Sequence, residues 1–199
     1  MPFSIDFEHR VAGKTADEAF RVIAAWLQEQ KAQVKASSPP THIEASHGRA
    51  LQPMGWRKDA RKTIVFDLRP EGPDVLVWAR VIPGALNASD VQTRPDEARA
   101  NWGELLAELW ERMGEKGAVQ EAIRRPGVDW EASLRRGRGM ISAGVGILVI
   151  GISVSIGLSL VIPNVYILAT GFLVFGILMA MYGMMIVRSA ARRLARQRK

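Results

Sequence analysis

The residues from Gly139 to Val187 include no Asp, Glu, Lys, Arg or His, and no other property of this sequence restricts its fold as much. A helix needs about 20 apolar residues to cross the roughly 30 Å hydrocarbon core of a bilayer. The stretch is too long for one span, but it contains two segments of suitable length, 140–162 and 165–187, separated by Pro163 and Asn164. We therefore expect residues 140–187 to form a transmembrane helical hairpin.

Much of the positive charge lies beside this uncharged stretch. The 199 residues include 27 Lys and Arg against 20 Asp and Glu, a net charge of +7. Residues 1–123 hold 16 of the basic residues and 18 of the acidic ones, whereas residues 188–199 hold six basic residues and no acidic one. A nucleic-acid-binding protein concentrates positive charge on its folded domain. The distribution therefore argues against a nucleic-acid partner and favours contact with the anionic headgroups of a lipid bilayer.

Arginines flank both predicted spans. Lys and Arg close to the ends of spans are retained on the cytoplasmic side of a membrane. We therefore expect an integral membrane protein with both termini in the cytoplasm. No basic segment followed by an apolar run opens the sequence, so no cleavable signal peptide is expected. The flanking residues are Arg135, Arg136 and Arg138 before the first span and Arg188, Arg192 and Arg193 after the second.

The polar part of the sequence, residues 1–117, has the periodicity of one small α+β domain. Apolar and polar residues alternate in several segments, as is typical of half-buried strands. A strand with one apolar face must cover that face, and an antiparallel sheet covered on one side by helices is the simplest solution. The fold class expected is thus α+β, with a small antiparallel sheet and two covering helices before the transmembrane hairpin. The expected strands are 3–8, 33–37, 41–46, 62–69 and 74–82.

Two helices complete this domain. The first begins with the capping box Thr15-Ala16-Asp17-Glu18, and the second opens at Pro95. The resulting order of strand, helix, four strands and helix, over residues 3–114, resembles one repeat of the TATA-binding-protein-like fold and a shortened START-like (SRPBCC) helix-grip domain. The resemblance rests on element order, without a diagnostic motif. It implies a curved sheet and a long helix that enclose a groove.

Residues 118–139 are expected to form an amphipathic juxtamembrane connector. Trp130 stands among apolar residues and next to Arg135 and Arg136, a combination suited to the headgroup level of a bilayer. Glycines at 127, 137 and 139 favour a hinge. The basic tail, residues 188–199, is interpreted as a cytoplasmic continuation of the second helix.

Small residues recur along both predicted spans. Close approach of backbones drives the association of membrane helices, so stripes of small residues indicate packing surfaces. The stripes pack the two helices of the hairpin together, or one of them serves a neighbouring subunit. The first stripe contains Gly139, Ala143, Gly151, Ser155 and Ser159, and the second contains Gly176, Ala180 and Gly183.

The loop of residues 51–62 is the most distinctive part of the domain. It places Trp56 before Arg57, Lys58, Arg61 and Lys62. One hypothesis is a loop that dips into the membrane, with Trp56 at the interface and the basic residues on phosphates. The alternative is that Trp56 folds back over the edge of the sheet and the basic residues form a solvated rim.

Evidence for catalysis or a cofactor is lacking in the sequence. There is no Ser nucleophile in an elbow, no glycine-rich phosphate loop and no cysteine. His42, Glu44 and His47 have metal-ligating side chains, but on a strand His47 points away from the other two. These three are weak candidates for a metal site, and no metal or cofactor is expected.

We therefore expect a non-enzymatic membrane protein whose domain is an interaction or assembly module, within a homo-oligomer or with another membrane-protein subunit. One alternative is a membrane-tethered carrier or sensor that holds a lipid or apolar ligand in a groove between sheet and helices. Another is a small channel or a channel-accessory subunit. The spans contain no ionisable residue, which argues against a proton-coupled transporter.

Overall fold

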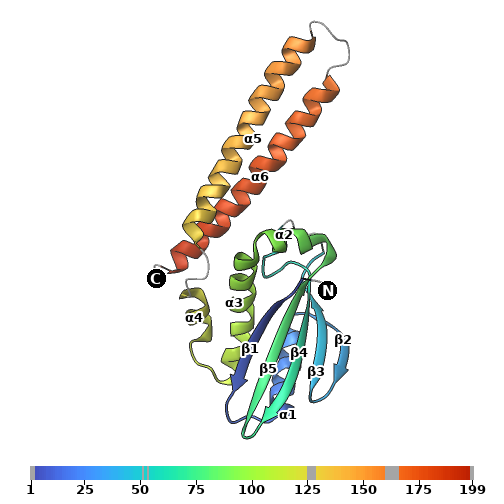
Figure 1. Ribbon diagram of the computed structural model, residues 1–199, viewed down its shortest axis with the longest axis vertical. Helices are drawn as coiled ribbons and strands as arrows, with labels where there is room; N and C mark the ends of the chain where they lie inside the picture. The colour runs from blue at the N-terminus through green and yellow to red at the C-terminus, as the bar shows by residue number, and fades with distance from the viewer. Residues whose placement is uncertain (1–2, 51, 53, 125–128, 160–165, 198–199) are drawn as a thin grey trace. The chain divides into compact units, whose positions relative to one another are not determined.

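The computed structural model describes residues 3–50, 52, 54–124, 129–159 and 166–197. The chain forms two compact units, Met1–Val128 and Asp129–Lys199, which are described separately below (Figure 1). The first is the polar α+β domain and the second contains the uncharged stretch. The predicted turn at Pro163 and Asn164 lies outside the described residues.

The first unit is built on a five-stranded antiparallel sheet with the order β1-β5-β4-β3-β2. This confirms the predicted α+β class. The long hairpin of β4 and β5 turns at Gly72, whose φ of 63° lies in the left-handed region that favours glycine. The strands are β1 (Ile5–Val11), β2 (Gln33–Ser38), β3 (His42–His47), β4 (Lys62–Glu71) and β5 (Asp74–Pro83).

The two predicted helices of the domain are present. α1 (Ala16–Glu29) begins with the capping box, in which the Thr15 hydroxyl accepts from the Glu18 amide and the Glu18 carboxylate accepts from the Thr15 amide at 2.9 Å. α3 (Pro95–Met113) has proline at its first position and ends at Gly114, whose φ is 111°. Proline therefore favours the start of α3 and glycine favours its end.

Three shorter helices were not predicted. η1 (Ala85–Asn87) and α2 (Ala88–Thr93) occupy the polar loop before α3, and α4 (Ala118–Arg124) follows it. Each is at most two turns long, so its sequence has too few positions to show a helical period.

The core of the domain lies between one face of the sheet and the helices α1 and α3. Trp26 of α1 meets Phe66 of β4 edge to face, with ring centroids 6.2 Å apart. Trp102 and Leu106 of α3 are also fully buried. These side chains fill the space in which the fold resemblance implies a groove, so the interior of this small domain is a packed core.

The second unit is a hairpin of two long helices, α5 (Trp130–Ser159) and α6 (Tyr166–Gln197) (Figure 1). Within them, Trp130–Ser155 and Thr170–Gln197 are long and apolar enough to cross a membrane. α6 continues into the basic tail as predicted. Residues 130–139 of the predicted connector belong to the regular helix α5, so the structure shows no hinge at Gly137 and Gly139. The amphipathic character of residues 118–139 stays a prediction.

The early start of α5 has a local cause. The carboxylate of Asp129 accepts a hydrogen bond from the amide of Ala132 at 2.8 Å, so it satisfies one of the amides at the helix start that lack a partner within the helix. Because α5 begins here, Arg135, Arg136 and Arg138 belong to the same continuous helix as the first predicted span.

Candidate functional site

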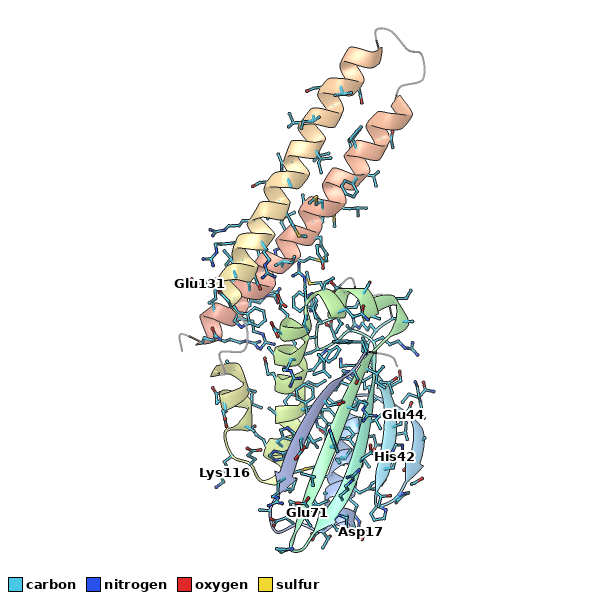
Figure 2. All side chains as sticks on the ribbon, viewed as in Figure 1. Asp17, His42, Glu44, Glu71, Lys116 and Glu131 are labelled. Atoms are coloured by element: carbon cyan, nitrogen blue, oxygen red, sulfur yellow. The ribbon has the colours of Figure 1, made fainter. Side chains whose placement is uncertain are left out.

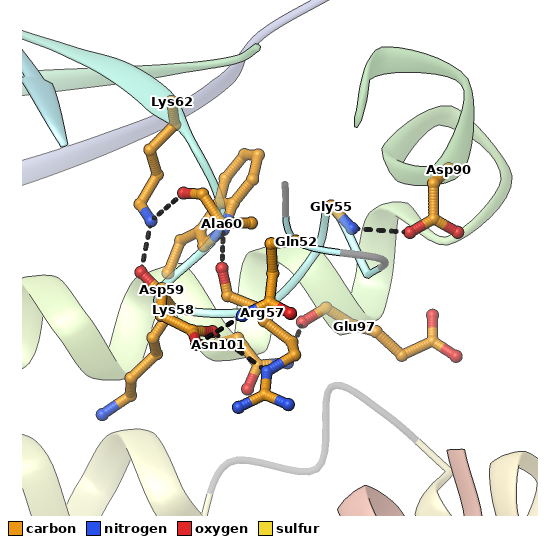
Figure 3. A network of polar contacts seen from close by, with 11 residues as sticks. Gln52, Gly55, Arg57, Lys58, Asp59, Ala60, Lys62, Asp90, Glu97 and Asn101 are labelled. Atoms are coloured by element: carbon orange, nitrogen blue, oxygen red, sulfur yellow. Dashed lines mark hydrogen bonds and ion pairs between the residues drawn. The ribbon is translucent and has the colours of Figure 1, made fainter. Parts of the chain in front are cut away.

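The loop of residues 51–62 is folded into the domain, which contradicts its interpretation as a membrane-dipping loop. The Trp56 side chain is 1% exposed. The Gly55 amide donates to the Asp90 carboxylate at 2.7 Å (Figure 3). The Trp102 indole donates to the Arg57 carbonyl at 3.3 Å, so the loop is bonded to both α2 and α3. The structure thus agrees with the alternative in which Trp56 folds back onto the domain.

Three of the four basic side chains of the loop have acidic or backbone partners within the domain. Arg57 pairs with Asp59 at 3.0 Å. Lys58 lies 2.8 Å from Glu104 and 3.1 Å from Glu108, both on α3. Arg61 is exposed, whereas Lys62 is 1% exposed. The loop therefore does not present four basic side chains to phosphates, because α3 takes up Lys58 and the interior of the domain takes up Lys62, which leaves Arg57 and Arg61 at the surface.

Lys62 is an unusual core residue. Its side-chain nitrogen donates to the carbonyls of Lys58 and Ala60, the latter at 3.0 Å (Figure 3). The same nitrogen lies 6.0 Å from the centre of the Trp102 ring. Burial lowers the pKa of Lys62 to about 7, with a further lowering by Lys58 and an opposing effect of Asp59. A neutral amine has two hydrogens, which match these two carbonyl acceptors.

His47 is the cross-strand neighbour of Lys62 on the inner face of the sheet. Burial, followed by the charge of Lys62, lowers the pKa of His47 to about 4. Both side chains are enclosed, so we assign to this pair a structural role in which folding favours the neutral forms.

His42, Glu44 and His47 do not converge on a metal site. His42 lies 2.7 Å from Asp67, and Glu44 lies 3.7 Å from Lys35, both on the outer face of the sheet, where Figure 2 labels His42 and Glu44. His47 points to the inner face, as the two-residue period of a strand requires. Among the described residues, no group of three or more His, Asp or Glu side chains is placed to hold a metal ion.

The domain has a cavity of about 370 Å³ between the edge strand β1 and the helices α3 and α4. Small side chains and the aromatic rings of Phe7 and Trp110 line its apolar part, and carboxylates surround it. The ring of His9 stacks on Trp110 at 4.5 Å, and its Nε2 lies 2.9 Å from Glu115. The lining includes Asp6, Glu8, Asp96, Arg99, Ala100, Gly103, Ala107, Ala118, Glu121 and Ala122.

This cavity was missed in the sequence because its residues come from positions 6 to 122 and meet only in the folded domain. The single local indication is Gly103, in the middle of α3, where glycine weakens a helix. A methyl group built at Gly103 would lie 3.4 Å from the Phe7 ring. Burial lowers the pKa of His9, and the charge of Glu115 opposes this shift.

The hairpin helices pack along glycines spaced seven residues apart. A Cβ atom at Gly144 would lie 2.8 Å from the Ala180 nitrogen and the Gly176 carbonyl, and one at Gly183 would lie 2.7 Å from the Gly137 carbonyl. The predicted second stripe of Gly176, Ala180 and Gly183 therefore lies in the contact between the helices, where backbones approach most closely.

The predicted first stripe is only partly in this contact. Gly151 and Ser155 are buried, but Ala143 is exposed and a Cβ at Gly139 would meet nothing within 4 Å. Steps of four residues turn by about 40° beyond a full helical turn, so the stripe drifts off the contact, whereas steps of seven keep to it. The Ser159 side chain lies outside the described residues.

The six arginines beside the spans lie near one end of the hairpin. Gly137 of α5 lies against Gly183 and Val187 of α6, so the basic residues of both helices are close to this contact. Trp130 is buried, and the Arg193 guanidinium lies 5.7 Å from the centre of its ring. Its place at the headgroup level of a bilayer stays a prediction. The other residues, Arg135, Arg136, Arg138, Arg188 and Arg192, are exposed.

Comparison with known proteins identifies no family for this chain: no family model and no curated protein matches it. Among solved structures it is similar to CalU16 from Micromonospora echinospora, with 12% identity, coverage of 60% of this chain and 82% of that one, and a TM-score of 0.39. It is also similar to MLL2253 from Mesorhizobium loti, with 13% identity, coverage of 62% and 98%, and a TM-score of 0.39.

Proposed function

We propose that this chain is an integral membrane protein of two spans whose α+β domain is a non-enzymatic binding module at the cytoplasmic face. The observation that carries the proposal is the outer surface of the hairpin. Glycines occupy the contact between α5 and α6, and many of the described positions that face outward carry large apolar side chains, such as Val149 and Phe175, each 59% exposed. No charged residue occurs from Gly139 to Val187, and the apolar surface of the described parts of α5 and α6 suits lipid.

The orientation of the hairpin rests on its arginines. The arginines before the apolar part of α5 and those after the apolar part of α6 lie near the same end of the hairpin. This arrangement is expected when a chain crosses the membrane and returns. Basic residues at the ends of spans favour the cytoplasmic side and contact with anionic headgroups. In the proposed topology both termini, and with them the α+β domain, are in the cytoplasm.

An assembly role is supported by small residues that the hairpin contact leaves unused. Gly139, Ala143 and Gly146 lie on one side of α5, and a Cβ atom at either glycine would meet nothing within 4 Å. These positions suit close approach by a helix of another subunit. The apolar-ligand carrier is less well supported, because Trp26, Phe66 and Trp102 occupy the space between sheet and helices.

A charge placed on the hairpin surface tests the membrane part of this proposal. We expect the full-length protein to stay with membranes during alkaline carbonate extraction, and Val149→Arg to raise the extracted fraction severalfold, because a guanidinium within the hydrocarbon region is costly. Leu86→Arg is the matched control, since Leu86 is an apolar residue with 78% exposure in the α+β domain. Complete extraction of the unmodified protein would refute the proposal.

A further inference from the structure

We propose that the α+β domain docks on the bilayer through Arg49, Arg61 and Leu86, with the arginines on anionic lipid headgroups and the leucine at the acyl boundary. These three residues and Ala85 are called the docking surface. The inference rests on the proposed function, because a cytoplasmic domain joined to two spans stays close to the inner leaflet. It deepens that function by naming the part of the domain that binds lipid.

The docking surface lies where two loops leave the same end of the sheet. β4 begins beside the last residue of β3 and the last residue of β5, so the segments 48–61 and 84–94 meet there. Backbone hydrogen bonds join the two segments. The Arg61 amide donates to the Arg49 carbonyl at 3.0 Å, and the Gly84 amide donates to the Arg61 carbonyl at 2.9 Å.

Leu86 is the most exposed large apolar side chain in the described part of the chain. It is 78% exposed, whereas the highest value on α5 and α6, the helices proposed to face lipid, is 61% at Ile150. Among the described residues of the first unit, Val34 is the only other exposed large apolar side chain. Transfer of such a side chain from water to the acyl boundary of a bilayer is favourable.

The fold holds Leu86 in this outward position. Leu86 is the central residue of η1, and the next residue, Asn87, is buried and donates its amide to the Gly84 carbonyl at 2.8 Å. A Cβ atom at Gly55 would lie 2.5 Å from the Asn87 Cβ, so η1 packs closely against the loop of Gly55. A side chain on a fixed turn loses little conformational freedom when it docks, which favours binding.

The two arginines supply positive charge beside Leu86. Both side chains are exposed, and neither forms a hydrogen bond or an ion pair with another residue that the structure describes. A Cβ atom at Gly84 would lie 3.5 Å from Cβ and Cγ of Arg61, so this side chain begins next to the backbone that leads to Leu86. A guanidinium binds phosphate through two parallel hydrogen bonds and is attracted to an anionic leaflet.

The carboxylates of the same two segments are already engaged. The segments contain five basic residues and two acidic ones. Asp59 pairs with Arg57 at 3.0 Å, and Asp90 accepts a hydrogen bond from the Gly55 amide at 2.7 Å. These carboxylates therefore leave the charge of the two arginines in the docking surface available for anionic headgroups.

A lipid surface suits the docking surface better than a folded partner does. One leucine beside two arginines is far smaller than a protein–protein interface, which covers about 800 Å² on each partner. A bilayer requires less, because the proposed spans already hold the domain beside it and raise the effective concentration of lipid. The composition therefore favours anionic lipid as the partner.

A fluorophore at Ala85 tests the docking. Ala85 is exposed and precedes Leu86, and the protein has no cysteine, so Ala85→Cys can carry a single nitrobenzoxadiazole group. In the full-length protein reconstituted into vesicles of phosphatidylcholine and phosphatidylserine, the emission should shift to shorter wavelength and be quenched by nitroxide-labelled lipid. Quenching should be severalfold weaker in phosphatidylcholine alone, and salt should weaken it in the mixed vesicles.

Variants assign the effect to the docking surface. The double change Arg49→Gln, Arg61→Gln should lower the ratio of docked to free domain about tenfold or more. Leu86→Ser should lower it about tenfold. The matched control is the double change Arg21→Gln, Lys116→Gln, because it removes two exposed positive charges from α1 and from the turn after α3. This control should leave the quenching unchanged.

A second label position provides the reference for water. The fluorophore on Ser37→Cys should show neither the shift nor the quenching, because Ser37 lies on β2 toward the other end of the sheet. Circular dichroism establishes that each variant is folded, and Leu86→Ser decides the question if the double arginine variant is not.

Four results would overturn the docking proposal. The label at Ala85→Cys stays in water, the quenching is equal in the two kinds of vesicle, the control double change lowers it as much as the loss of Arg49 and Arg61, or the emission shifts without nitroxide quenching. The last result would indicate contact with protein in place of lipid.

A failure of docking is distinguishable from a failure of the two-span proposal. A protein that resists carbonate extraction while the label at Ala85→Cys stays in water has the spans and lacks the docking. A protein that carbonate extracts completely contradicts both proposals. Leu86→Arg remains a control in that extraction, because alkaline carbonate releases contacts at the membrane surface and retains helices that span it.

Discussion

Replacing Gly144 by leucine should separate the two helices of the hairpin. A side chain at this position would begin 2.8 Å from the Ala180 nitrogen and the Gly176 carbonyl, and these are backbone atoms of α6 that cannot turn aside. The helices would have to move apart along the whole contact and lose the close packing that holds them together. We expect the free energy of unfolding of the hairpin to fall by about 2–4 kcal/mol.

Gly146→Leu is the matched control. Gly146 is two residues further along the same helix, and a Cβ there would meet nothing within 4 Å. Its effect should stay within about 1 kcal/mol, the range of helix propensity. The protein contains no cysteine, so fluorophores can be attached at Ser142→Cys and Leu178→Cys, and energy transfer between them during SDS titration reports helix separation. Equal losses for both glycine variants would contradict the packing described here.

The stability of the α+β domain should rise between pH 7 and about 10 because of Lys62. The lysine releases its proton near pH 7 in the folded domain but only near its ordinary pKa of 10.5 when unfolded. In this window the unfolded state therefore binds more protons, so the free energy of unfolding increases with pH, on the order of a few kcal/mol in total. Below pH 7 Lys62 is protonated in both the folded and the unfolded state. The cost of burying its charge then lowers the free energy of unfolding by its full amount.

Lys62→Met should remove this pH dependence. Methionine has a similar volume and no charge, so the slope between pH 7 and 10 should become nearly flat, although the carbonyls of Lys58 and Ala60 lose a donor. Lys116→Met changes an exposed lysine and should keep the slope of the unmodified protein. The measurement is urea-induced unfolding of the full-length protein in detergent, followed by tryptophan fluorescence. An unchanged slope in Lys62→Met would show that Lys62 keeps its proton in the core.

The elements of the domain followed from local patterns in the sequence. Apolar residues recur at every second position on the buried face of β4 and β5, and Thr15, Glu18 and Pro95 are residues that favour a helix start. The structure agrees with these predictions because each pattern depends only on residues that are close together in the sequence. The hairpin was evident for the same reason, since a long run without charge is visible at once.

The environments of particular side chains could not be predicted in this way. A tryptophan next to basic residues is equally typical of a membrane-contacting loop and of a folded one. Trp56 is buried in a loop whose Lys58 pairs with Glu104 and Glu108 on α3, more than 40 residues later in the sequence. A spacing of four residues groups Gly139 and Ala143 with Gly151, whereas the contact between the helices repeats every seven residues. The cavity between β1, α3 and α4 depends on three elements that are distant in sequence.

Labelling of single cysteines from one side of a membrane tests the account most directly, because the unmodified protein has none. Ser37→Cys reports the exposed strand β2, Ser189→Cys the end of the second span, and Asn164→Cys the segment between the spans. In intact cells a membrane-impermeant maleimide should label position 164 alone, and positions 37 and 189 should react only after permeabilisation. Labelling of positions 37 and 189 from opposite sides, or of position 164 together with both from the inside, would contradict a hairpin that crosses the membrane twice.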